Sequence, residues 1–241
     1  MKRGFKEANS KPRRFYKSVE VAAAESGFSV QLDGRILRTP GGTHLIVPSE
    51  AIAAQVAEEW ATQDEIIEMA SMHATRLANT AIDSIPKARA ATADQIAAFA
   101  ASDLICYRAE NPQSLVARQA EHWDPLLIRV KHEAGVELVR AAGIVHQTQP
   151  QSSLNRVREM ALELDEFRLA GLAFGAALFG STVLAIAALR AWVDAETAFD
   201  LSRLDEAWQE ERWGVDVEAA ERTARLRQEA RMLGRWFAAL N

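Results

Sequence analysis

The side chains that could do acid–base or metal chemistry are few and are spread along this sequence. The five histidines include no pair at helical spacing around a glutamate and none with a cysteine partner, so we expect no metal site. His122 beside Asp124 could serve as an oriented base, but no serine or cysteine lies in a sequence context typical of a catalytic nucleophile. We therefore expect no catalytic residues and no cofactor. The histidines are His44, His73, His122, His132 and His146.

A stretch near the C-terminus, Leu204 to Gly214, combines acidic and aromatic side chains at high density. Tryptophan among charged residues is typical of the energetic centres of protein interfaces. Because an unpaired carboxylate in a core is very costly, some of these acidic side chains must face solvent or a partner. The alternative is a helix with a solvated acidic face whose tryptophans fill the core. The candidate partner-binding residues are Asp205, Glu206, Trp208, Glu210, Glu211 and Trp213.

Within this stretch we single out one acidic residue, and we leave one question about the two tryptophans open. Glu206 is the single residue that we expect to matter most for binding. Trp208 and Trp213 are five residues apart, so one can anchor in the core while the other is available to a partner, but the sequence does not decide which.

The charge is distributed unevenly along the chain. The net charge of −5 argues against a nucleic-acid binder, which needs a basic face for phosphate contacts. The first seventeen residues form a basic arm, which is either solvated or an anchor for an acidic partner. Its basic residues are Lys2, Arg3, Lys6, Lys11, Arg13, Arg14 and Lys17, against Glu7 alone.

The elements that must position these residues begin with a small antiparallel sheet between Phe15 and Val47. The segment from Phe28 to Leu32 alternates between apolar and polar residues, and Asp33-Gly34 is a hairpin-turn signal. Ser49 is a good N-cap for a helix whose apolar face, with Ile52, Val56 and Trp60, we expect to lie on the sheet. Residues 1–85 are thus predicted to form a β-rich domain, with its boundary at Pro86.

Residues 86–241 are predicted to be helical throughout, which makes the chain an α+β protein with a small antiparallel β-rich N-terminal domain and a larger all-helical C-terminal domain. Boundaries between the expected helices are indicated by Pro112, Pro150 and Gly214. The expected helices are 91–107, 114–135, 152–173, a broken apolar pair within 169–189, 195–213 and 217–241.

The apolar pair, Leu169 to Leu189, carries no charge and could be a core or a membrane span. Alanine and glycine supply much of its apolar character, and Gly180-Ser181-Thr182 interrupts it. The flanking segments are amphipathic and acidic, without the positive bias on one side that orients a span. We therefore expect two buried helices that meet at Gly180, and no stable membrane insertion.

Seven motifs in a fixed order resemble the assembly chaperones of the ATP synthase catalytic head (F1 sector) of the ATP-12 type. The resemblance extends from Arg14 to about Ala219. The motifs are RFYKSVEV from Arg14, VQLDGRILRTPGG from Val30, VPSE with the later EEW, TRLANTAID from Thr75, SDLICYRA from Ser102, WDPLL from Trp123 and LDEAWQEERWG from Leu204.

This resemblance implies a chaperone, not an enzyme, that binds the free α subunit of the catalytic head and hands it to the β subunit. The implied location is the mitochondrial matrix or, in bacteria, the cytoplasm. The single Cys106 fits a reducing compartment, and the absence of a convincing presequence favours the bacterial cytoplasm. We expect a monomer. Two alternatives stay open: a small-molecule enzyme that uses the cleft between the domains, and a membrane-associated assembly factor.

Overall fold

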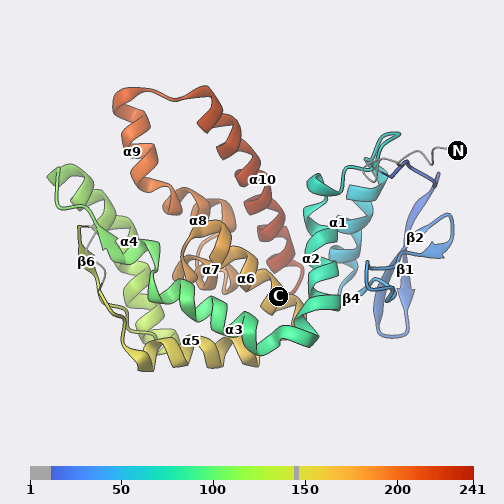
Figure 1. Cartoon of the computed structure of the whole chain (residues 1–241), viewed down its shortest axis with the longest axis horizontal. Helices are drawn as coiled ribbons and strands as arrows, with labels where there is room; N and C mark the ends of the chain where they lie inside the picture. Colours follow the sequence, from blue (N-terminus) through green and yellow to red (C-terminus); the bar gives the residue numbers. More distant parts are fainter. Residues whose placement is uncertain (1–11, 144–146) are drawn as a thin grey trace, which may run out of the picture. The chain divides into compact units, whose positions relative to one another are not determined.

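A computed structural model of the chain describes residues 12–143 and 147–241, so most of the basic arm, from residue 1 to 11, and His146 lie outside the described residues. The chain packs as two units, Met1–Asn79 and Thr80–Asn241 (Figure 1). A small antiparallel sheet with its helices is followed by a larger helical region, which confirms the predicted fold class. Pro86, the expected domain boundary, lies in the first turn of the long helix α3 (Ile85–Ala101).

The sheet of the first unit is organised around β2, which pairs antiparallel with each of the other three strands. Asp33 and Gly34 have φ angles of +48° and +74°, so both residues of the predicted hairpin turn are left-handed. The Asp33 carboxylate also accepts hydrogen bonds from the backbone N–H groups of Lys17 and Ser18, at 3.0 and 2.8 Å. The strands are β1 Val19–Ala24, β2 Gly27–Leu32, β3 Arg35–Ile36 and β4 Ile46–Val47.

Helix α1 (Glu50–Ala61) covers this sheet as the sequence predicts. The Ser49 hydroxyl accepts a hydrogen bond from the Ile52 N–H, and Ile52, Val56 and Trp60 are buried. A 3₁₀ turn (Met69–Ser71) precedes α2 (His73–Asn79), which packs on α1.

Arg14, one of the basic residues of the predicted arm, is tied to the end of α1. Its guanidinium donates hydrogen bonds to the carbonyl groups of Ala61, Gln63 and Tyr16. The Tyr16 hydroxyl in turn donates to the Trp60 carbonyl at 2.6 Å. The Pro12 carbonyl also accepts a hydrogen bond of 2.8 Å from the Ile67 N–H, so the chain is held in place from Pro12 onward.

The second unit is built from helices, but it differs from the predicted set in four places. The predicted helix 91–107 begins earlier, at Ile85, and already ends at Ala101, before a 3₁₀ turn. The predicted helices 152–173 and 195–213 are each two helices, interrupted at Leu164–Asp165 and at Arg203. The first break occurs because Asp165 caps α6, its carboxylate accepting from the N–H groups of Phe167 and Arg168. In addition, two short parallel strands, β5 and β6, lie among the helices where no strand is predicted.

The elements of the second unit are a π-helical turn (Thr80–Ser84), α3 Ile85–Ala101, a 3₁₀ turn (Leu104–Cys106), β5 Tyr107–Arg108, α4 Gln113–Ala134, β6 Ala141–Ala142, α5 Gln151–Glu163, α6 Glu166–Phe179, α7 Thr182–Leu189, α8 Ala195–Ser202, α9 Leu204–Trp213 and α10 Val217–Ala238.

The apolar stretch 169–189 forms the core of this unit, which confirms the buried pair. Helices α6 and α7 meet at Gly180, whose φ is +61°, and the Ser181 hydroxyl caps α7. A Cβ atom at Gly175 would lie 3.1 Å from a Leu233 methyl group and 3.2 Å from the Cβ of Ala185, so glycine lets α6, α7 and α10 approach closely. None of the described helices is long and apolar enough to cross a membrane.

Asp103 holds the junction between α6 and α7 from within the core. Its fully buried carboxylate accepts hydrogen bonds from the N–H groups of Val183, at the start of α7, and of Ile105. Burial raises the pKa of Asp103 from 3.8 to about 6, although these hydrogen bonds oppose the shift. The Leu104 N–H also bonds to the Gly180 carbonyl at 3.0 Å, so the 3₁₀ turn closes directly over the helix break.

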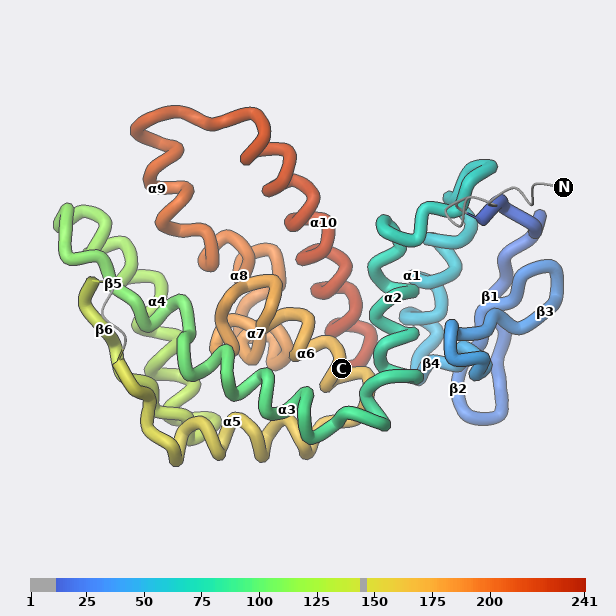
Figure 2. The backbone as a smooth tube through the Cα atoms, in the orientation of Figure 1, coloured from blue at the N-terminus to red at the C-terminus, as the bar shows by residue number. Residues whose placement is uncertain are grey.

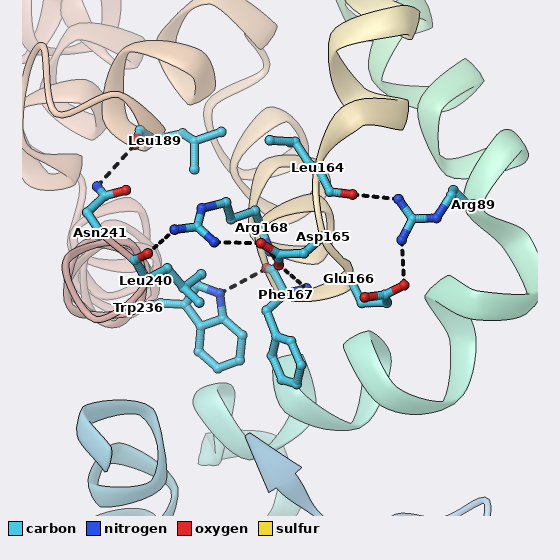
Figure 3. A network of polar contacts seen from close by, with 10 residues as sticks. All are labelled: Arg89, Leu164, Asp165, Glu166, Phe167, Arg168, Leu189, Trp236, Leu240 and Asn241. Atoms are coloured by element: carbon cyan, nitrogen blue, oxygen red, sulfur yellow. Dashed lines mark hydrogen bonds and ion pairs between the residues drawn. The ribbon is translucent and has the colours of Figure 1, made fainter. Parts of the chain in front are cut away.

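The C-terminal end of α10 is tied to the start of α6 by a polar network (Figure 3). The Trp236 indole N–H donates to the Phe167 carbonyl at 3.1 Å. Arg168 bridges the Asp165 carboxylate, at 2.5 Å, and the Leu240 carbonyl. This network anchors the last turns of α10, whereas its first turns lie beyond the core.

Candidate partner-binding surface

The six candidate residues all lie on α9, which together with the start of α10 projects from the helical body (Figure 1). Leu204 and Trp208 are buried and anchor the helix against its neighbours, α4 and α8. Asp205 and Glu206 occupy its first turn, where a negative charge interacts favourably with the helix dipole. The helix therefore has one face in the core and leaves the other to solvent.

Asp205 is engaged inside the protein. Its carboxylate accepts a hydrogen bond of 2.7 Å from the side-chain amide of Gln119 on α4. Gln119 is fully buried, and its amide oxygen accepts from the Ala109 N–H at 2.9 Å. Asp205 thus joins α9 to α4 and, through Gln119, to the chain after β5. A partner that took over the bonded oxygen of this carboxylate would have to break an internal hydrogen bond.

Two further carboxylates of α9 form ion pairs within the unit. Glu210 lies 3.2 Å from the Arg203 guanidinium, and Glu211 lies 2.8 Å from that of Arg118 on α4. The hydrogen bond from Arg118 lowers the pKa of Glu211 below its ordinary value. The Arg118–Glu211 pair is exposed to solvent, where such interactions contribute little stability and can exchange partners, whereas the Arg203 side chain is only 15% exposed.

Glu206 differs from these three acidic residues. It is exposed, and its carboxylate forms no hydrogen bond or ion pair with any part of residues 12–143 and 147–241. Of the four candidate carboxylates, Glu206 alone has no partner among the described residues. It is consequently the one that a partner can engage without breaking an internal contact.

The two tryptophans of α9 have opposite environments, a point that the sequence left open. Trp208 is 6% exposed, and the Arg212 guanidinium stacks 3.5 Å from the centre of its ring. Trp213 is 74% exposed and touches Trp208 edge to face, with ring centres 5.9 Å apart. Trp208 therefore anchors the helix, and Trp213 is available to a partner.

Two exposed valines that are not among the predicted site residues follow Trp213 in the chain. Val215 and Val217, in the linker and first turn after α9, are 59% and 74% exposed. Asp216 between them caps α10 by accepting from the Ala219 N–H, which holds the linker in shape. The signal in the sequence was an apolar residue on each side of Asp216, which is a typical N-cap residue.

Glu206 and Trp213 lie on the same face of α9 because they are seven residues, or two helical turns, apart. We name the set Glu206, Trp213, Val215 and Val217 the α9 corner. It combines a free carboxylate with exposed apolar side chains on a helix held by buried anchors. Such a surface can bind a protein with an apolar patch next to a positive charge.

Comparison with known proteins shows related chains along nearly the whole length of the sequence. The family model described as ATP12 chaperone protein matches residues 13–131. The mitochondrial protein atp12 of Schizosaccharomyces pombe is 27% identical over 221 residues, which cover 87% of this chain and 76% of the relative.

Solved structures extend the similarity to the fold. The crystal structure of Atp12 from Paracoccus denitrificans is 38% identical, with a TM-score of 0.86, and the match covers 95% of this chain and 98% of that one. The crystal structure of the Atu1473 protein from Agrobacterium tumefaciens is also 38% identical, with a TM-score of 0.88, covering 95% of this chain and 87% of that one. The chain therefore belongs to the ATP12 chaperone family.

Proposed function

We propose that this protein is an ATP synthase assembly chaperone that binds the free α subunit of the catalytic head and releases it to the β subunit. Membership of the ATP12 chaperone family supports the general role. The observation that carries the specific proposal is the α9 corner, where Glu206, which has no partner in the described part of the chain, and the exposed Trp213 share one helix face.

A subunit of a ring has a physical need for such a partner. Before assembly it exposes the apolar surface that its neighbours will bury, and surfaces of this kind aggregate. A chaperone must cover the surface and then leave it, so its affinity has to be moderate. A few aromatic anchors and one steering charge meet this requirement better than a large apolar face.

Release follows from competition in this proposal. The β subunit buries the same surface of the α subunit over a larger area, and it displaces the small α9 corner without an energy source in the chaperone. The site of action is the compartment where the catalytic head is assembled, which is the cytoplasm in a bacterium and the mitochondrial matrix in a eukaryote.

The test reverses the free charge and compares it with a matched change elsewhere. Glu206→Lys should leave the melting temperature nearly unchanged, because surface substitutions usually alter stability by about 0.5 kcal/mol or less. Its Kd for freshly purified α subunit, measured by calorimetry, should rise at least tenfold, which corresponds to about 1.4 kcal/mol.

Glu20→Lys is the control, since Glu20 is an exposed glutamate on β1 of the other unit and undergoes the same charge change. It should bind the α subunit like the unmodified chain. If folded Glu206→Lys binds as tightly as the control, the α9 corner is not the recognition surface.

A further inference from the structure

The strand that the sequence did not predict, β6, belongs to an exposed extended segment from Glu137 to Ala142, which we name the edge segment. It runs beside α4, and β5 is its strand partner (Figure 2). Leu138 is half-buried, and its neighbours Glu137, Val139 and Arg140 are exposed. Nothing in this segment has helical or alternating periodicity, so its conformation depends on what holds it.

One side of the edge segment is pinned by side chains that replace a neighbouring strand. The Gln149 amide accepts from the Val139 N–H at 2.7 Å and donates to the Val139 carbonyl at 2.9 Å. The Ser153 hydroxyl makes the same pair of contacts with Glu137, at 3.0 and 2.7 Å. These bonds hold residues 137–139 in an extended form where β5, which pairs with Ala141 and Ala142, does not reach.

The opposite side of the segment is unpaired. Leu138 and Arg140 alternate along the chain with Glu137 and Val139. The backbone N–H and carbonyl groups of Leu138 and Arg140 form no hydrogen bond with the part of the chain that the structure describes. In an extended chain, successive N–H groups point to opposite sides. The edge segment therefore presents a fixed open edge, which is a template for one more strand.

A groove between this segment and α4 contains two pockets, and Asp124 and Arg140 line both of them. One pocket, of about 220 Å³, is bounded by Leu127, Ile128 and Leu138 among others. The second, of about 260 Å³, is bounded by Val116, Ala120, Ala141 and Ala142 together with Arg108. Ile128 is 57% exposed, so the first pocket has an accessible apolar side chain, and the ion pair of Lys131 with Glu137, at 2.5 Å, lines the same pocket.

The charge between the two pockets is positive. Asp124 is shared by two guanidinium groups, with Arg108 at 2.7 Å and Arg140 at 2.8 Å. The Nε of Arg108 is buried and has no hydrogen-bond partner among the described residues. Two cations thus face one anion, and a second carboxylate would complete the pairing.

We propose that the edge segment binds an extended stretch of a partner protein in which a carboxylate side chain lies between two apolar side chains at alternate positions. The stretch adds as a strand along Leu138 and Arg140. Its two apolar side chains enter the pockets, and its carboxylate meets Arg140, whose side chain is 58% exposed, whereas that of Arg108 is 11% exposed. Main-chain hydrogen bonds supply affinity, and the pockets and the charge supply specificity.

This surface is separate from the α9 corner. The groove uses Val116, Ala120, Asp124 and Ile128 of α4, whereas α9 is held by Arg118 and Gln119. The proposal goes beyond α-subunit recognition at α9, and it stands if Glu206 proves unimportant.

Two labelled peptides test the proposal on the full chain. The peptide Val-Thr-Glu-Thr-Val places two valines and a glutamate on one side of a strand, and Val-Thr-Lys-Thr-Val differs only in the central charge. Fluorescence anisotropy should show at least tenfold tighter binding of the glutamate peptide. In nuclear magnetic resonance spectra, the amide signals of Leu138 and Arg140 should shift on binding.

Three variants locate the interaction. Arg140→Glu should weaken binding of the glutamate peptide at least tenfold, while Arg225→Glu, a reversal of an exposed arginine on α10, should not. Leu138→Pro removes an N–H that has no partner among residues 12–143 and 147–241, so it should reduce binding while the melting temperature stays the same. Equal binding of both peptides, unshifted edge amides, or full binding by Arg140→Glu would overturn the proposal.

Discussion

Carboxylates lie at helix starts in two regions of the second unit, and their surroundings give them opposite roles. At the α6–α7 junction, Asp103 is fully buried and accepts hydrogen bonds from backbone N–H groups on two elements. In the first turn of α9, Glu206 is exposed and unpaired within the described chain. The same chemical group thus contributes to the fold in one place and stays available to a partner in the other.

Asp205 shows that the difference is decided by geometry and not by sequence position. It is adjacent to Glu206 in the chain, yet it points to the buried Gln119 while Glu206 does not. Successive residues of a helix are separated by about 100°, so neighbours in sequence can belong to different surfaces. Four predictions test this contrast between the junction and α9.

The largest effect is expected for a charge placed in the junction. Ala185 is fully buried on α7, and Ala185→Asp would place a carboxylate there without a partner. We expect a loss of several kcal/mol in the free energy of unfolding, or no folded protein. Ala177→Asp is the control, because Ala177 is an exposed alanine on α6. Denaturant unfolding should separate the two variants, and equal stabilities would show that the junction is not a dry core.

The second effect is a pH dependence that only the buried carboxylate should show. The pKa of Asp103 is raised from 3.8 to about 6 in the folded chain, so the folded state holds the proton more tightly than the unfolded state. Its contribution to stability is full below about pH 4 and is lost as the pH rises through 6, by about 3 kcal/mol. In Asp103→Asn this dependence is absent.

Denaturant unfolding of both proteins between pH 4 and pH 7 measures this contribution. The stability of the unmodified chain relative to Asp103→Asn should fall over this range. A difference that rises or stays level with pH would mean that the junction favours the ionised carboxylate.

A smaller loss is expected where α9 is fastened to α4. Asp205→Ala leaves the side-chain amide of the buried Gln119 without its acceptor, which should cost about 1–3 kcal/mol. Glu206→Ala, one residue away, should change stability by about 0.5 kcal/mol or less. Thermal and denaturant unfolding of the pair measures the contrast directly. If the two substitutions cost the same, the bond to Gln119 does not hold α9.

The smallest effect on stability is expected at the tip of α9. Trp213→Ala removes a side chain that is 74% exposed and has an edge contact with Trp208, so unfolding should change by about 0.5 kcal/mol. Binding to the α subunit should weaken by more than that, because an exposed aromatic residue is typical of an interface anchor. A variant with lower stability and unchanged binding would assign Trp213 to the fold.

Local patterns in the sequence determined much of this fold. The alternation before Asp33-Gly34 predicts β2 and its hairpin, and Ser49 predicts the start of α1. The uncharged stretch interrupted at Gly180 predicts α6, α7 and their burial. Each of these depends on the backbone preferences and hydrophobic period of residues close together in the chain, which a single sequence displays. The order of the motifs likewise indicated the family.

Tertiary structure alone decided which carboxylate of α9 has no partner among the described residues and which tryptophan is exposed. It also decided that residues 141–142 form a strand, β6. Gln119 and Asp205 are 86 positions apart, and no local pattern marks them as partners. Segment 137–142 is extended because Gln149 and Ser153 bond to its backbone, not because its own residues alternate. Such contacts form only after the helices pack and bring distant side chains within hydrogen-bonding distance, so their physical cause is absent from any short stretch of the sequence.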